Sequence, residues 1–273
     1  MAASSFALSW IWLFLLSGAG AVPMGGSPLP ADPVLSAIAP EECLLYAAYA
    51  GQQAASAESS NQTEQLFAEP QVQRFFAEVE SQVMKAVRKN VGPAPQQQAL
   101  LQNLPPLLTL LVTRPSALYV EEVSPAPGGV TVEAGVVISA GDQRAAVEKA
   151  VANLLAAAGP QAPQFVEESL AGLTWRRAAL PPQAPPLRWA WKGNYLLLAV
   201  GPQTPAKLVE RMEGDAPQWL DKGRAAHREV ERELSFMRLD VAGILNRVQP
   251  IVAQQNPEAW PIAERLGLTS IRE

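Results

Sequence analysis

Two pairs of adjacent glutamates are the residues in this sequence best suited to acid–base chemistry. Glu121-Glu122 and Glu167-Glu168 both lie in or beside segments predicted as strands. A pair of carboxylates can serve as acid and base in a hydrolase without a histidine. Neighbouring residues of a strand point to opposite faces, however, so an adjacent pair does not by itself form a catalytic dyad. Such charges also discourage strand edges from pairing with one another, and we favour this interpretation.

The other common motifs of catalysis and cofactor binding do not occur in the sequence. It contains one histidine, His227, and one cysteine, Cys43, so a zinc or haem site built from clustered ligands is not predicted. His227 lies in a charged segment and is expected to be solvated, whereas Cys43 begins a predicted strand and is expected to be a buried, inert thiol. No nucleophile elbow, Walker loop or dinucleotide fingerprint occurs. The sequence therefore predicts no catalytic, cofactor-binding or metal-ligating residue and no cofactor.

Three tryptophans of the predicted strands could instead form a flat platform for a carbohydrate or a peptide. They are Trp175, Trp189 and Trp191, and the cationic residues Arg176, Arg188 and Lys192 alternate with them. Alternation within a strand places the indoles together on the apolar face. We therefore expect the tryptophans, Trp189 in particular, to pack in the core beneath helices rather than to form a platform.

Composition indicates a globular protein that does not bind nucleic acid. The chain has 273 residues and is 48% hydrophobic, which is enough for a sizeable core in one or two domains. Its net charge is -5 and its sequence pI is about 5.2, with basic residues scattered among acidic ones. Because a nucleic-acid-binding protein presents a basic face, no such partner is expected.

The N-terminal segment has the features of a signal peptide. An apolar run from Phe6 to Leu16 precedes the first charged residue, Asp32, and is followed by small residues ending in Ala19-Gly20-Ala21. Small residues at this spacing are typical of a signal-peptidase site. We expect residues 1–21 to be removed, and the protein to be exported to the periplasm or the extracellular space with Val22 at its start. No lysine or arginine precedes the run, so an uncleaved anchor is the alternative, although the run is short for a membrane span.

Alternating strand patterns and helical periodicity predict an α+β fold. The clearest unit is a hairpin over Leu187–Val200 with its turn at Gly193-Asn194, followed by a helix that Thr204 caps and Gly214 ends. The other predicted strands cover residues 43–51, 117–123, 130–138, 164–169, 173–179 and 234–240. The other predicted helices cover residues 69–89, 96–111, 142–158, 216–228, 243–254 and 257–266. Strands in adjacent pairs, with helices between the groups, favour a mostly antiparallel sheet with helices packed on one face.

The predicted elements divide the exported chain into three parts. Residues 22–40 are rich in proline, glycine, serine and alanine and are predicted to be a linker. Residues 41–231 form the α+β domain. Residues 232–273 repeat the strand-then-helix order with which that domain opens. We interpret them as the start of a second module that is truncated at Glu273, or as a packed helical extension, and expect loose packing or an open sheet edge there.

Several segments together resemble a group of large exported bacterial proteins of unknown function. They are the signal-like start, the Pro40-Glu-Glu-Cys-Leu-Leu-Tyr46 strand, the Phe67–Phe76 segment and the Trp191–Gly201 segment. The resemblance covers most of the exported chain and implies export and repeated α+β modules. It implies no catalytic residues and no activity.

Two hypotheses about function follow from these features. The first is an exported, non-catalytic protein with a structural or interaction role, which keeps no stable membrane span after signal removal. Its partner is unknown, and a protein is the candidate. The alternative is an extracytoplasmic hydrolase that uses carboxylates. The first hypothesis expects Glu121, Glu122, Glu167 and Glu168 to be scattered over the surface, whereas the second expects two of them to face one cleft.

Overall fold

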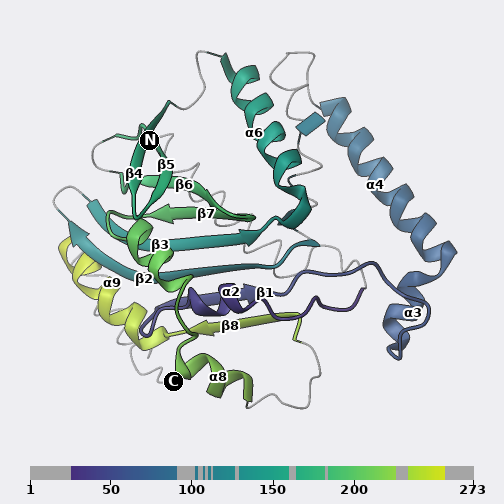
Figure 1. The fold of residues 1–273 in the computed structure, drawn as a ribbon, viewed down its shortest axis with the longest axis horizontal. Helices are drawn as coiled ribbons and strands as arrows, with labels where there is room; N and C mark the ends of the chain where they lie inside the picture. The colour runs from purple at the N-terminus through teal and green to yellow at the C-terminus, as the bar shows by residue number, and fades with distance from the viewer. Residues whose placement is uncertain are drawn as a thin grey trace.

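A computed structural model shows an α+β protein built on one antiparallel sheet (Figure 1). The described residues are 26–90, 102–103, 107, 110–111, 113–126, 129–159, 164–181, 184–225 and 233–255. The predicted signal peptide, His227 and the predicted helix over residues 257–266 lie outside them, as does most of the predicted helix over residues 96–111. The predicted fold class, α+β with a mostly antiparallel sheet, is confirmed.

Eight strands form the sheet in the order β4-β5-β6-β7-β3-β2-β1-β8. They are β1 (Leu45–Tyr49), β2 (Ser116–Ala126), β3 (Gly129–Ser139), β4 (Phe165–Leu170), β5 (Leu173–Ala178), β6 (Leu187–Lys192), β7 (Tyr195–Val200) and β8 (Ser235–Leu239). Every neighbouring pair is antiparallel. The predicted hairpin is β6–β7, and its second strand lies inside the sheet between β6 and β3. Its apolar residues are buried on one face and half-buried on the other.

The described helices flank this sheet. They are α2 (Pro33–Ala37), α3 (Gln62–Ala68), α4 (Pro70–Asn90), the 3-10 turn η1 (Gly141–Gln143), α6 (Arg144–Ala158), α7 (Thr204–Arg211), α8 (Gln218–Ala225) and α9 (Val241–Gln255). Helical periodicity therefore located α4, α6, α7, α8 and α9 from the sequence. The two short helices α2 and α3 were not expected, since each is too short to show a periodic pattern.

Helices cover both faces of the sheet, which we name the α7 face and the α6 face. On the α7 face, helices α2, α7 and α8 pack against buried strand residues that include Tyr46, Val137 and Leu197. On the α6 face, α6 packs against Ile138 and Leu196. The expectation of helices on one face is therefore wrong. Its physical cause is that the central strands β3 and β7 carry apolar side chains on both sides, and both sides need cover.

The tryptophans of β5 and β6 lie on different faces. Trp175 is 0% exposed on the α7 face, and its indole N–H donates to the carbonyl oxygen of Leu170 at 3.2 Å. Trp189 and Trp191 are only half-buried on the opposite side of the sheet. The guanidinium of Arg176 lies 4.9 Å from the ring centre of Trp189, and that of Arg144 lies 5.0 Å from Trp191. The prediction that Trp189 is a core residue is therefore wrong.

The buried side of β6 is the one that carries Arg188. Its guanidinium forms an ion pair with Glu168 and donates to the carbonyl oxygen of Gly201 at 2.9 Å. A buried cation is tolerated when its hydrogen bonds are satisfied in this way. The alternation of β6 was therefore predicted correctly, but its buried side was inverted.

Residues 26–40, which were predicted as part of a linker, belong to the domain. Asp32 caps α2 by accepting a hydrogen bond from the Val34 backbone N–H at 3.0 Å, and the hydroxyl of Tyr195 in β7 donates to the same carboxylate at 3.0 Å. Leu35 is buried in the cluster of the α7 face, and Tyr46 of β1 donates to its carbonyl oxygen at 2.9 Å. Composition suggested a linker because proline and glycine are frequent, but long-range contacts fix this segment.

A buried carboxylate anchors the start of the same segment. Glu64 of α3 accepts hydrogen bonds from the backbone N–H groups of Ser27 and Ser56 and from the hydroxyls of Ser27 and Ser59, at 2.5 to 3.2 Å. The hydroxyls of Ser27 and Ser59 and the two backbone donors lower the pKa of Glu64 to about 2, although burial opposes them. The segment around Ser27 is thereby held against the loop that precedes α3.

Residues 233–255 extend the same sheet and do not start a separate module. Strand β8 pairs with β1 over its whole length, and α9 packs against β2. The interpretation as a second module is therefore wrong for these residues, and a packed extension describes them. No described strand pairs with the other side of β8, where Met237 is 67% exposed, so an open edge is present as expected. None of the helices in the described part is both long and apolar enough for a bilayer crossing.

The buried tryptophan gives a direct test of which face of β5 and β6 is the core. Trp175→Ala should lower the free energy of unfolding by about 3–5 kcal/mol, because it leaves a cavity in the buried cluster of the α7 face. Trp189→Ala should cost less, about 1–2 kcal/mol, since that ring is partly solvated. Urea unfolding followed by circular dichroism measures both values. Equal losses for the two variants would contradict the assignment of the faces.

Candidate functional site

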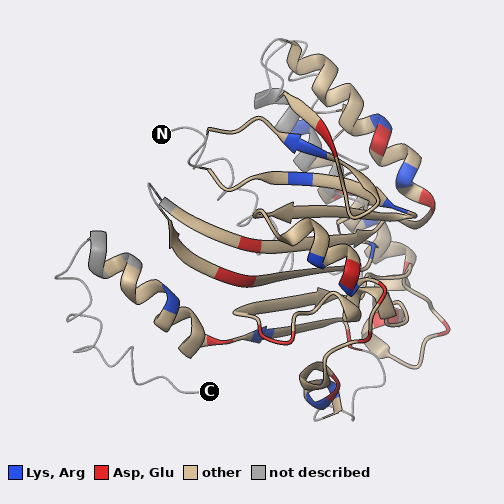
Figure 2. Cartoon of the chain, turned by 60° about the vertical axis from the view of Figure 1, so that its left-hand side comes forward, with Lys and Arg blue, Asp and Glu red and all other residues tan. Residues whose placement is uncertain are grey.

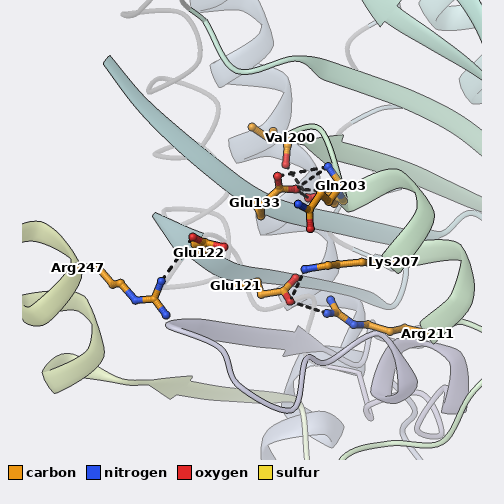
Figure 3. Close-up of polar contacts among 9 residues, drawn as sticks. Glu121, Glu122, Glu133, Val200, Gln203, Lys207, Arg211 and Arg247 are labelled. Carbon is orange, nitrogen blue, oxygen red and sulfur yellow. Dashed lines mark hydrogen bonds and ion pairs between the residues drawn. The ribbon is translucent and has the colours of Figure 1, made fainter. Parts of the chain in front are cut away.

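The most concentrated polar cluster of the described chain lies where α7 crosses the sheet (Figure 3). Glu133 of β3 is 4% exposed and points at the first turn of α7. Its carboxylate accepts hydrogen bonds from the backbone N–H of Thr204 at 2.8 Å, from the Thr204 hydroxyl at 2.7 Å and from the Gln203 N–H at 3.2 Å. A helix N-terminus attracts negative charge, because its first N–H groups have no partner within the helix.

This arrangement corrects the predicted cap of α7. The sequence places Thr204 as the capping residue, but Gln203 occupies that position and its side chain forms no capping hydrogen bond. Glu133, which is distant in sequence, supplies the acceptor instead. Sequence reasoning missed Glu133 because the regularly spaced valines of its strand lie on the opposite face. The face that carries Glu133 was therefore expected to be exposed to solvent. A hint was available in the helix start, where no side chain before Thr204 is a good N-cap.

Gly201 makes the approach of Glu133 to α7 sterically feasible. Its φ is +108°, and an added Cβ would lie 2.4 Å from a carboxylate oxygen of Glu133 and 2.4 Å from the carbonyl oxygen of Val132. Any side chain here would meet both a strained backbone conformation and a clash. The loop that joins β7 to α7 is therefore fixed by the carboxylate it covers.

Glu121 of β2 holds the second half of α7. One carboxylate oxygen accepts from the ammonium of Lys207 at 3.0 Å and from the guanidinium of Arg211 at 2.9 Å. Burial alone would raise the pKa of Glu121, but the hydrogen bonds and charges of Arg211 and Lys207 outweigh it, so the pKa of Glu121 is lowered. Glu121 is therefore a persistent anion near neutral pH.

Lys192 of β6 completes the attachment at the C-terminal end of α7. Its ammonium donates to the carboxylate of Glu213 at 2.7 Å and lies 3.4 Å from the carbonyl oxygen of Val209. A cation at this end of a helix interacts favourably with the unpaired carbonyl groups. The helix is thus held by an anion at its start, an anion beneath its middle and a cation at its end.

A β-bulge in β2 sets the direction of the neighbouring glutamates. The register between β2 and β3 shifts between Val120 and Glu122, which places Glu122 opposite Glu133. Glu121 pairs with α7, whereas Glu122 lies 3.6 Å from the guanidinium of Arg247 in α9. A bulge places one extra residue opposite its partner strand and re-aims side chains. The simple alternation assumed from the sequence therefore does not hold at this pair.

A small open pocket of about 160 Å³ lies beside Glu121, at the end of the sheet near α9. Its lining residues are Glu41, Glu42, Cys43, Leu44, Glu121, Arg238, Asp240, Gly243 and Arg247. Cys43 is buried as predicted, and burial raises the pKa of its thiol, so the reactive thiolate is disfavoured. Asp240 accepts a hydrogen bond from the Gly243 N–H at 2.7 Å and so supports the start of α9.

The second predicted pair of glutamates lies in β4, at the other end of the strand order. Glu167 pairs with Arg176 at 3.2 Å, while Glu168 pairs with Arg188 and lies 3.5 Å from Arg177. Since β4 is the first strand in the sheet and β2 the sixth, the two pairs are not brought together. All four glutamates thus have arginine or lysine partners, and none faces another of the four across a common cleft in the described chain.

No group of histidine, cysteine and carboxylate side chains in the described residues could hold a metal ion. Comparison of the chain with protein-family models, curated proteins and solved structures gave no match. The structure is that of an antiparallel α+β protein in which the four candidate glutamates pair with cationic side chains of its own helices and strands.

The cap of α7 can be tested by removing its acceptor. Glu133→Ala should lower the free energy of unfolding by about 2–3 kcal/mol, because it leaves buried N–H groups of the first turn without a partner. Glu148→Ala is a suitable control, since Glu148 forms an exposed pair with Arg144 and should contribute about 0.5 kcal/mol or less. Denaturant unfolding of both variants measures the difference. Similar losses would show that Glu133 does not hold α7.

The lowered pKa of Glu121 gives a pH dependence of definite sign. A glutamate in the unfolded chain has a pKa of about 4.3, and the pKa of Glu121 in the folded protein is lower. Its stabilising contribution is therefore complete above about pH 5 and is lost as the pH falls through the folded pKa. The free energy of unfolding of wild type should exceed that of Glu121→Gln by the largest amount near pH 7. This difference should become smaller towards pH 3, as denaturant unfolding at each pH can measure. The difference between wild type and Glu210→Gln, an exposed site on α7, should change much less.

Proposed function

We propose that this chain is an exported, non-catalytic protein that acts through structural contacts with a protein partner. The observation that carries this proposal is the pairing of Glu121, Glu122, Glu167 and Glu168 with cationic side chains of other elements. A general acid needs a carboxyl group that is protonated near the working pH. The lowered pKa of Glu121 opposes that role.

The distribution of charge supports a protein partner over a nucleic acid. Figure 2 shows lysine and arginine beside aspartate and glutamate on several of the same elements. Several apolar side chains are exposed in the described part, among them Phe75, Val166 and Met237. These three residues lie on α4 and on the two strands at the ends of the sheet, β4 and β8, so each is a separate candidate contact site.

Export rests on the features of the N-terminal segment and on the resemblance to large exported bacterial proteins of unknown function. The apolar run before Ala21 and the small residues at its end support cleavage before Val22. Retention by an uncleaved N-terminal segment is the alternative location. Both locations place the domain outside the cytoplasm.

The second candidate, a hydrolase that uses carboxylates, has one observation in its favour. Glu41, Glu42, Glu121 and Asp240 all line the pocket beside α9. Its volume of about 160 Å³ is below the range of about 300–1,000 Å³ that is common for ligand pockets. Of these groups, Glu121 is bound by two cations, which opposes a role as proton donor, and Asp240 accepts a hydrogen bond from the backbone N–H of Gly243.

Expression of the full chain in a bacterial host tests export and catalysis together. The secreted protein should begin at Val22 on N-terminal sequencing, and Ala21→Phe should block processing whereas Ala31→Phe should not, because only Ala21 lies at the cleavage site. Soluble protein that begins at Met1 would contradict the export proposal.

The same secreted protein can be assayed against chromogenic glycosides, esters and peptides. Wild type and Glu121→Gln should give the same background rate if the cluster is structural. Turnover that Glu121→Gln abolishes and Glu148→Gln preserves would establish the hydrolase and exclude the non-catalytic proposal.

A further inference from the structure

We draw no further inference here: the strongest candidate, the open edge of β8 at the end of the sheet, where Met237 is 67% exposed, carries nothing because no contact in the described chain shows what pairs with it.

Discussion

The contact between the buried carboxylate of Glu133 and the first turn of α7 is the constraint on which much of the α7 face depends. A buried anion is costly unless hydrogen bonds compensate it, and here the helix start supplies them. Once α7 begins at that point, its direction places Lys207 and Arg211 above Glu121. Its apolar residues, such as Leu208, then cover the sheet. One charged contact therefore sets the position of a helix that closes the core.

Periodicity in the sequence located most strands and helices, because alternation and helical spacing are local properties. It did not determine which side of a strand is buried. In β6 both sides carry residues that could be covered, and the tryptophan side is the more hydrophobic choice. Burial of Arg188 instead depends on Glu168 and on the Gly201 carbonyl group, which other strands and loops provide. Such partners are not visible from the alternation itself.

Contacts with residues distant in the sequence also explain the errors at the two ends of the described chain. Residues 26–40 have the composition of a linker, yet Tyr195 and Glu64 hold them to the sheet and to α3. Strand β8 was recognised as a strand, but its pairing with β1 depends on the arrangement of the whole sheet. The candidate carboxylates were likewise identified correctly as residues. Their cationic partners on α7, α9 and neighbouring strands could not be assigned before the fold was known.

The pairing of these carboxylates with cations affects function because it determines how readily they can donate a proton. A carboxylate that two cations hold in its charged form is a poor proton donor near neutral pH. Glu121 is in this state, so its interactions stabilise α7 and compete with catalysis. In the described chain one carboxylate oxygen of Glu121 has both cationic partners, whereas its other oxygen is buried without a hydrogen-bond partner.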